Sequence, residues 1–170
     1  MNHAQLHEML SAKLPAIKRR LNKVNSGGCG LFALALHQEL SRRCVHSQIV
    51  LVNQGFTKRD VERFIDRHEA KGINGAYQSM FKGVDPKFGN VIGNPLNGHI
   101  AVRIRGVLYD ADGHLTRDSA ISKHLTVKTM EQFVRINSCW NYTFTRVNYR
   151  NKDIIGTFEK FFSGMFEVAS

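Results

Sequence analysis

The chain contains few cysteines and few prolines, and it has no long apolar run. Its 3 cysteines, Cys29, Cys44 and Cys139, are an odd number without close pairing, which argues against a disulfide framework and fits a reducing compartment. With 3 prolines and 42% hydrophobic residues, the composition is that of a folded protein rather than a disordered one. The longest apolar stretch, 29–36, is far shorter than the ~20 residues of a membrane-spanning helix, so we expect no transmembrane segment.

The N-terminal segment also lacks the features of a secretory signal, which are a basic region, an unbroken apolar region and a small-residue cleavage site in that order. The expected location is therefore the cytoplasm. A length of 170 residues suits one hydrophobic core, so we expect a single domain over 1–170, with an N-terminal helical segment (1–24), a core (25–150) and a C-terminal amphipathic helix (152–168). Small size and high basicity fit a housekeeping enzyme, a phage or mobile-element product, or an effector that acts on a host.

Positively charged residues outnumber negatively charged ones by 24 to 14, which gives a formal net charge of +10. A charge of this size attracts nucleic acid, an anionic membrane surface or an acidic protein through long-range fields, and it does not choose among them. One hypothesis is therefore a basic module that binds nucleic acid through contacts with phosphates. Its candidate residues are Lys18, Arg19, Arg20, Lys23, Arg42, Arg43, Arg103 and Arg105.

Apolar residues recur at helical spacing at both ends of the chain. The N-terminal pattern contains Pro15, which ends one helix or opens the next. The C-terminal pattern is strongly amphipathic, and we expect its apolar face to pack in the core rather than on a membrane surface or a partner. The residues are Leu6, Met9, Leu10, Leu14, Ile17 and Leu21 at the N-terminal end, and Ile154, Ile155, Phe158, Phe161, Phe162, Met165 and Phe166 at the C-terminal end.

Between these ends the sequence predicts a mixture of helices and strands. The turn sequence NSGG precedes an expected helix over 29–42, whose first two turns are apolar nearly all round, as in a buried helix. The other expected elements are a strand over 45–52, a helix capped by Thr57 and Asp60, a long loop over 73–98, a hairpin over 99–112, a short helix over 116–125, a helix capped by Thr129 and Gln132, and a strand over 142–149.

Cys29 stands at the expected start of the buried helix, between glycines. A thiol attacks as its thiolate, which the partial positive charge and the unpaired N–H groups of a helix N-terminus stabilise. The Cys29 amide is a candidate donor to an oxyanion, and Asn25 and Ser26 are candidates for the second donor, the alternative being that either of them caps the helix. Without a partner, a lone cysteine is more often a small and inert core residue.

A catalytic cysteine needs a base, and His99 opens the first strand of the expected hairpin. A two-residue turn at Arg105 and Gly106 would place both Asp110 and Asp112 on the face of the sheet that carries His99. Either carboxylate would then be able to orient the imidazole as the third member of a triad. The alternative is that both aspartates serve the turn in the sequence DADGH.

The sequence GGCGLFALAL, followed further along the chain by GHIAVRIRGVLYDADG, resembles the papain-like superfamily in its wide sense: papain-type and NlpC-type peptidases, transglutaminase-like proteins and arylamine acetyltransferases. The resemblance implies an α+β, papain-like fold in which a buried helix that starts at the catalytic cysteine packs on a small antiparallel sheet. It also implies Cys29, His99 and either Asp110 or Asp112 as catalytic residues. The position of the oxyanion-hole glutamine of papain-type enzymes is occupied here by Lys23.

The resemblance implies a cysteine-dependent hydrolase or acyl-transferase, such as a peptidase, a deamidase or a transglutaminase-like enzyme, that forms a thioacyl-enzyme intermediate with a protein or peptide substrate. An acidic protein would suit the basic surface. No cofactor or metal is expected, because His3 and His7 lie one helical turn apart but no second ligand pair has zinc-like spacing. The alternatives are the nucleic-acid-binding module and a catalytically inactive papain-like scaffold that binds a partner.

Overall fold

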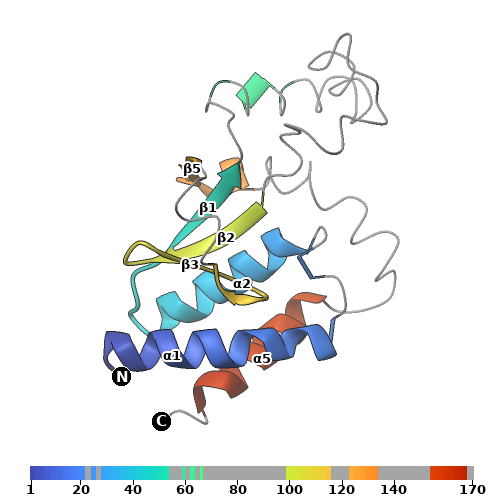
Figure 1. The fold of residues 1–170 in the computed structure, drawn as a ribbon. Coiled ribbons are helices and arrows are strands. Elements are labelled where there is room, and N and C mark those ends of the chain that lie inside the picture. The colour runs from blue at the N-terminus through green and yellow to red at the C-terminus, as the bar shows by residue number, and fades with distance from the viewer. Residues whose placement is uncertain are drawn as a thin grey trace.

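A computed structural model describes residues 1–21, 24–25, 28–53, 59, 62–63, 66, 99–115, 123–133 and 154–167. Its elements are, in chain order, α1 (His3–Lys13), the 3-10 helix η1 (Leu14–Arg19), α2 (Cys29–Arg42), β1 (Gln48–Asn53), β2 (His99–Ile104), β3 (Val107–Asp110), β4 (Gly113–His114), β5 (Lys123–Thr126) and α5 (Ile154–Glu167) (Figure 1). Of the expected helix after Thr57, residues 59, 62–63 and 66 are described, and they are helical. The loop over 73–98 and the strand over 142–149 lie outside the described residues.

The N-terminal helical segment is divided at Pro15, as predicted. Asn2 caps α1 with a capping box, in which its side chain accepts a hydrogen bond from the Gln5 backbone N–H while the Gln5 side chain accepts one from the Asn2 backbone. Pro15 lies in the first turn of η1, where a missing N–H costs nothing because no intrahelical acceptor is available there. The apolar residues of both helices, from Leu6 to Ile17, are buried in the main core.

The five strands form one antiparallel sheet in the order β4-β3-β2-β1-β5. The fold class is therefore α+β, as expected. The expected short helix over 116–125 is wrong at its end, because Lys123–Thr126 forms β5 and pairs with β1, with Leu51 opposite Leu125. Without β5, the outer edge of β1 would carry unpaired backbone N–H and C=O groups. The predicted cap at Thr129 is confirmed. The Gln132 N–H donates to the Thr129 hydroxyl, and the Lys128 N–H donates to the Gln132 side-chain oxygen.

The hairpin of β2 and β3 has the predicted register. Arg105 and Gly106 form its two-residue turn with φ values of 48° and 88°, the left-handed pair that a type I′ turn requires. Ile104 accordingly lies opposite Val107, and Val102 lies opposite Tyr109. Because this register sets which face each side chain occupies, it decides where the side chain of Asp110 lies relative to His99.

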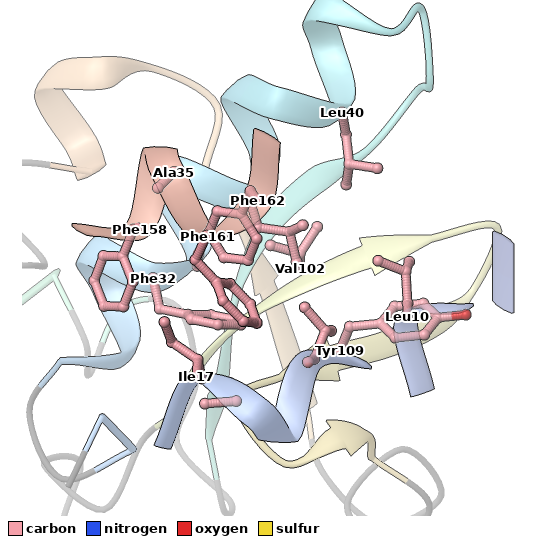
Figure 2. Close-up of a cluster of buried hydrophobic side chains, with 14 of the residues drawn as sticks. Leu10, Ile17, Phe32, Ala35, Leu40, Val102, Tyr109, Phe158, Phe161 and Phe162 are labelled. Atoms are coloured by element: carbon pink, nitrogen blue, oxygen red, sulfur yellow. The ribbon is translucent and has the colours of Figure 1, made fainter. Parts of the chain in front are cut away.

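Helix α2 is central to the fold and has the predicted bounds. It contacts β2 on one side and α5 on the other (Figure 1). The Phe32 ring of α2 packs edge-on against Phe158 and Phe162 of α5, with ring centroids 5.7 and 5.2 Å apart (Figure 2). Burial of each such ring contributes about 1.5–3 kcal/mol to the free energy of folding. The apolar face of α5 therefore packs in the core, as predicted. Among the described helices, none has both the length and the apolar character that crossing a bilayer requires.

Candidate functional site

Cys29 is the first residue of α2 and is buried, with 2% of its surface exposed. Gly28 is the N-cap of the helix, and no side chain caps it, so the expectation that Asn25 caps this helix is wrong. The first backbone bond within the helix runs from the Phe32 N–H to the Gly28 carbonyl at 3.0 Å. The N–H groups of the first turn, including that of Cys29, therefore point toward the thiol end of the helix without an intrahelical acceptor.

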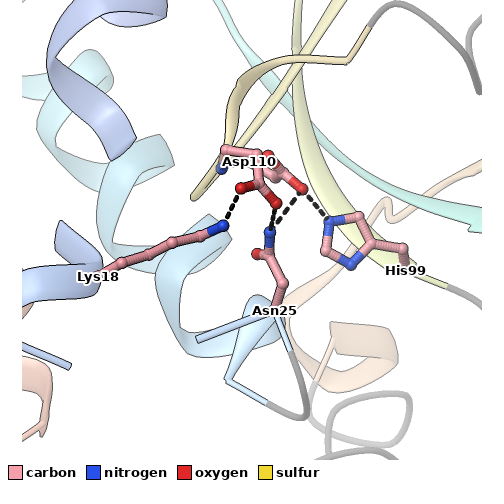
Figure 3. Close-up of polar contacts among 5 residues, drawn as sticks. Lys18, Asn25, His99 and Asp110 are labelled. Atoms are coloured by element: carbon pink, nitrogen blue, oxygen red, sulfur yellow. Dashed lines mark hydrogen bonds and ion pairs between the residues drawn. The ribbon is translucent and has the colours of Figure 1, made fainter. Parts of the chain in front are cut away.

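His99, the first residue of β2, contacts both other members of the expected triad. Its Nε2 atom donates a hydrogen bond to Oδ2 of Asp110 at 2.7 Å (Figure 3). The Cys29 side chain acts on it as well, since it is among the groups that raise the pKa of His99. Because Nε2 is engaged by the carboxylate, Nδ1 is the ring nitrogen that remains for the thiol. The start of the buried helix, the start of β2 and the end of β3 thus bring three residues from separate parts of the sequence together.

The surroundings of His99 favour its charged form. Burial by itself lowers the pKa of His99, but the hydrogen bond to Asp110 and the electrostatic attraction of Asp110 and Cys29 outweigh burial and raise the pKa from 6.5 to about 10. An imidazolium beside a sulfur stabilises the thiolate over the thiol. The arrangement therefore places a cationic imidazolium beside the start of α2, where Cys29 lies.

The carboxylate that orients His99 belongs to Asp110, which is 2% exposed. Its Oδ2 accepts from His99 and, at 3.0 Å, from the Asn25 side-chain amide, while its Oδ1 accepts from the Asp112 backbone N–H at 2.6 Å. Burial of an unpaired carboxylate costs free energy, and the three donors to Asp110 offset that cost. Of the two aspartates that the sequence left as alternatives, Asp110 is the one that binds His99.

Asp112 does not contact His99 among the interactions of the described residues. Strand β3 ends at Asp110, so the alternation of side chains between faces stops before Asp112, which lies in the turn that leads to β4. Its side chain is 54% exposed and forms an ion pair with Lys18 (Figure 3). Asp112 therefore does not orient His99, although Asn25 holds it near Asp110. Lys18, one of the candidates for phosphate contact, is already paired with this carboxylate.

Asn25 joins the two aspartates. Its Nδ2 atom donates to Oδ2 of Asp110 and to Oδ2 of Asp112, at 3.0 and 2.5 Å, so both amide hydrogens are used (Figure 3). The Asn25 side chain therefore has no N–H left for an oxyanion, and the other predicted donor, Ser26, lies outside the described residues together with Lys23. The backbone N–H of Cys29 remains the candidate donor. We name the linked side chains of Lys18, Asp112, Asn25 and Asp110 the carboxylate clamp.

The histidine pair considered for metal binding has other surroundings. Nδ1 of His7 lies 2.6 Å from the hydroxyl of Tyr109, and the His7 ring packs edge-on against His114. The part of the chain that the structure describes holds no group of three or more His, Cys, Asp or Glu side chains suited to a metal ion.

The described residues define an α+β protein in which a cysteine, a histidine and an aspartate lie together at the start of a buried helix. Comparison of the chain with models of protein families, with curated proteins and with solved structures finds no match. The geometry of this site is consequently what points to a function.

Proposed function

We propose that this protein is a cysteine-dependent hydrolase or acyl-transferase that acts on a protein or peptide substrate through a thioacyl-enzyme intermediate. Cys29 is the nucleophile, His99 is the general acid and base, and Asp110 orients His99. The observation that carries the proposal is the position of His99, which is hydrogen-bonded to the buried Asp110 at 2.7 Å and has its pKa raised by both Asp110 and Cys29, the first residue of α2. A nucleophile, a base and a group that orients the base are the three parts of a catalytic triad.

The proposed reaction has two halves. In the first, Sγ of Cys29 forms a bond to the acyl carbon, the carbonyl oxygen becomes an oxyanion beside the Cys29 N–H, and His99 protonates the leaving amine as the bond to it breaks. In the second, water or an amine attacks the thioester, His99 accepts its proton, and the bond to sulfur breaks to release the product and the Cys29 thiolate. Water gives hydrolysis or deamidation, and an amine gives transfer.

The substrate side of the proposal rests on charge. A formal net charge of +10 favours an acidic protein or peptide because opposite charges speed encounter. We further propose that the enzyme works in the reducing cytoplasm, where a thiol nucleophile remains available.

Alkylation kinetics test the nucleophile and its base. We expect the rate at which iodoacetamide labels Cys29 to change little with pH near neutrality, because the charge of His99 keeps the sulfur in its reactive form. The exposed Cys44 serves as the control within the same chain, and its labelling should rise with pH. In His99→Ala, labelling of Cys29 should slow and acquire the pH dependence of Cys44.

Because Cys29 is buried, labelling is compared in its pH profile rather than in its absolute rate, with the unfolded chain as the reference for both thiols. Acyl transfer is followed with p-nitrophenyl acetate and mass spectrometry, which should find one acetyl group on Cys29 and none in Cys29→Ser. The proposal fails if Cys29 and Cys44 share one pH profile in the parent protein and His99→Ala leaves that of Cys29 unchanged.

A further inference from the structure

A hollow of about 560 Å³ lies at the other end of β2 from the Cys29 site. It is formed by the start of α1, the residues that follow α2, and the hairpin turn between β2 and β3. The strand between His99 and Ile104 separates the two sites by about 17 Å, at ~3.3 Å per residue. The hollow shares no lining residue with the carboxylate clamp or with Cys29, His99 and Asp110, so it is a separate feature of the fold.

The lining of this hollow is basic. No acidic side chain is among the described residues that line it. Helix α1 also begins at the hollow, so the positive end of its dipole lies there. Its first turn has no acidic side chain to neutralise that partial charge. The basic side chains are His3, Arg43, His46, Arg103 and Arg105.

Arg103 is held in place without being neutralised. Its Nε and Nη2 atoms donate to the Gln48 side-chain oxygen at 3.1 and 2.7 Å, and Nη2 also donates to the Thr126 hydroxyl at 2.8 Å. Both acceptors are uncharged, so the guanidinium keeps its full charge while its orientation is fixed by the sheet. A guanidinium that is already ordered loses little conformational entropy when it binds an anion.

Arg105 and His3 supply groups that have no partner in the described part of the chain. Arg105 is exposed at the hairpin turn and forms no hydrogen bond or ion pair there. Nε2 of His3 is buried and has no hydrogen-bond partner. The charge of Arg105 is therefore open to a ligand, whereas Nε2 of His3 is not accessible to solvent.

Arg43 and the end of α2 also lie at the hollow, and both already have hydrogen-bond partners within the protein. Arg43 gives its Nε–H to Glu39 at 2.7 Å, so it is the least available of the three arginines. In the last turn of α2, the carbonyls of Leu40 and Ser41 already accept the N–H groups of Val45 and Cys44 at 2.9 and 3.0 Å.

We infer that this hollow binds the phosphate group of a small phosphorylated molecule. Phosphate offers several strong acceptors and up to two negative charges, which match the fork of an arginine and an ordered cluster of donors. The volume lies within the range of about 300–1,000 Å³ that is usual for small-molecule sites. A nucleic-acid surface would need a continuous basic stripe, whereas Lys18, which begins the other basic segment, is paired with Asp112.

Calorimetric titration of the full chain with inorganic pyrophosphate and with inorganic phosphate tests the inference. We expect saturable binding at one site that weakens with salt. Arg105→Gln should raise the Kd of pyrophosphate about tenfold, because it removes a charge-assisted hydrogen bond to the ligand. Arg19→Gln is the matched control, since Arg19 is exposed, forms no interaction with the described residues and carries the same charge outside the hollow. It should change that Kd less than about twofold.

Thermal unfolding without ligand shows that each variant folds, and pyrophosphate should then raise the Tm of the parent and of Arg19→Gln more than that of Arg105→Gln. The inference is overturned if no saturable binding occurs, or if both variants weaken binding equally, which would indicate attraction by net charge. It is also overturned if a single-stranded oligonucleotide binds far more tightly than pyrophosphate and loses as much affinity in Arg19→Gln as in Arg105→Gln. None of these results depends on catalysis at Cys29.

Discussion

Asn25 and Asp110 lie 85 positions apart in the sequence, yet the Asn25 amide donates to the same oxygen of Asp110 that accepts from His99. The second hydrogen of that amide is given to Asp112, whose charge is balanced by Lys18. The carboxylate clamp thus holds two aspartates close together and fixes one of them against the histidine. Its effect on His99 is indirect, so Asn25 is a positioning residue.

Replacement of Asn25 tests the carboxylate clamp. Asn25→Ala removes two donors from carboxylates and should lower the free energy of unfolding by about 2 kcal/mol, the scale of a hydrogen bond to a charged group. Asn25→Asp keeps the shape but adds a third negative charge, so it should be less stable than the alanine variant at pH 7. Urea unfolding at pH 7 measures both. Equal stability of the parent protein and Asn25→Asp would contradict the clamp.

The two aspartates should differ sharply when each is made neutral. Asp110→Asn removes the charge that holds His99 in its cationic form, and it should slow p-nitrophenyl acetate hydrolysis by about 10²-fold or more, the lower end of what a positioned acid or base contributes. Asp112→Asn alters an exposed ion pair worth about 1 kcal/mol or less, and it should change the rate by less than about fivefold. A larger loss in Asp112→Asn than in Asp110→Asn would reverse the assignment.

The parts of the site that the sequence predicts are those governed by local pattern. The start of α2 at Cys29 follows from the glycine turn and the apolar period, and the hairpin register follows from a two-residue turn that places Gly106 at φ 88°. Once the register is known, the side of the sheet that carries Asp110 is known as well.

The remaining parts depend on contacts that no local pattern encodes. Lys18 and Asp112 are 94 positions apart, and nothing in either segment predicts that they meet. Asp112 was expected beside His99 because strand alternation was extended past Asp110, where the strand ends. The sequence does not predict strand β5 for a similar reason, because this strand forms by pairing with the edge of β1. Its own sequence is short and polar at its start, which is a weak strand signal.

Helix α5 gives a stability test of its core role. Phe162 is fully buried against Phe32 and Phe158, so Phe162→Ala should lower the free energy of unfolding by about 3–5 kcal/mol. Ile155 lies on the same helix but is 50% exposed, and Ile155→Ala should change stability by less than about 0.5 kcal/mol. Chemical denaturation distinguishes them. Similar small losses in both variants would mean that this helix does not pack in the core of the protein in solution.

The raised pKa of His99 predicts how stability varies with pH. A histidine whose pKa is 6.5 in the unfolded chain and about 10 in the folded one binds its proton more tightly when folded. Its stabilising contribution is therefore complete below pH 6.5 and is lost as pH rises toward 10, because the unfolded state then gives up the proton first. The difference in unfolding free energy between the parent protein and His99→Gln should shrink steadily over this interval, as measured by urea unfolding at several pH values. NMR titration of the His99 ring gives an independent reading, and a midpoint near 6.5 would show that Asp110 and Cys29 do not hold the imidazolium.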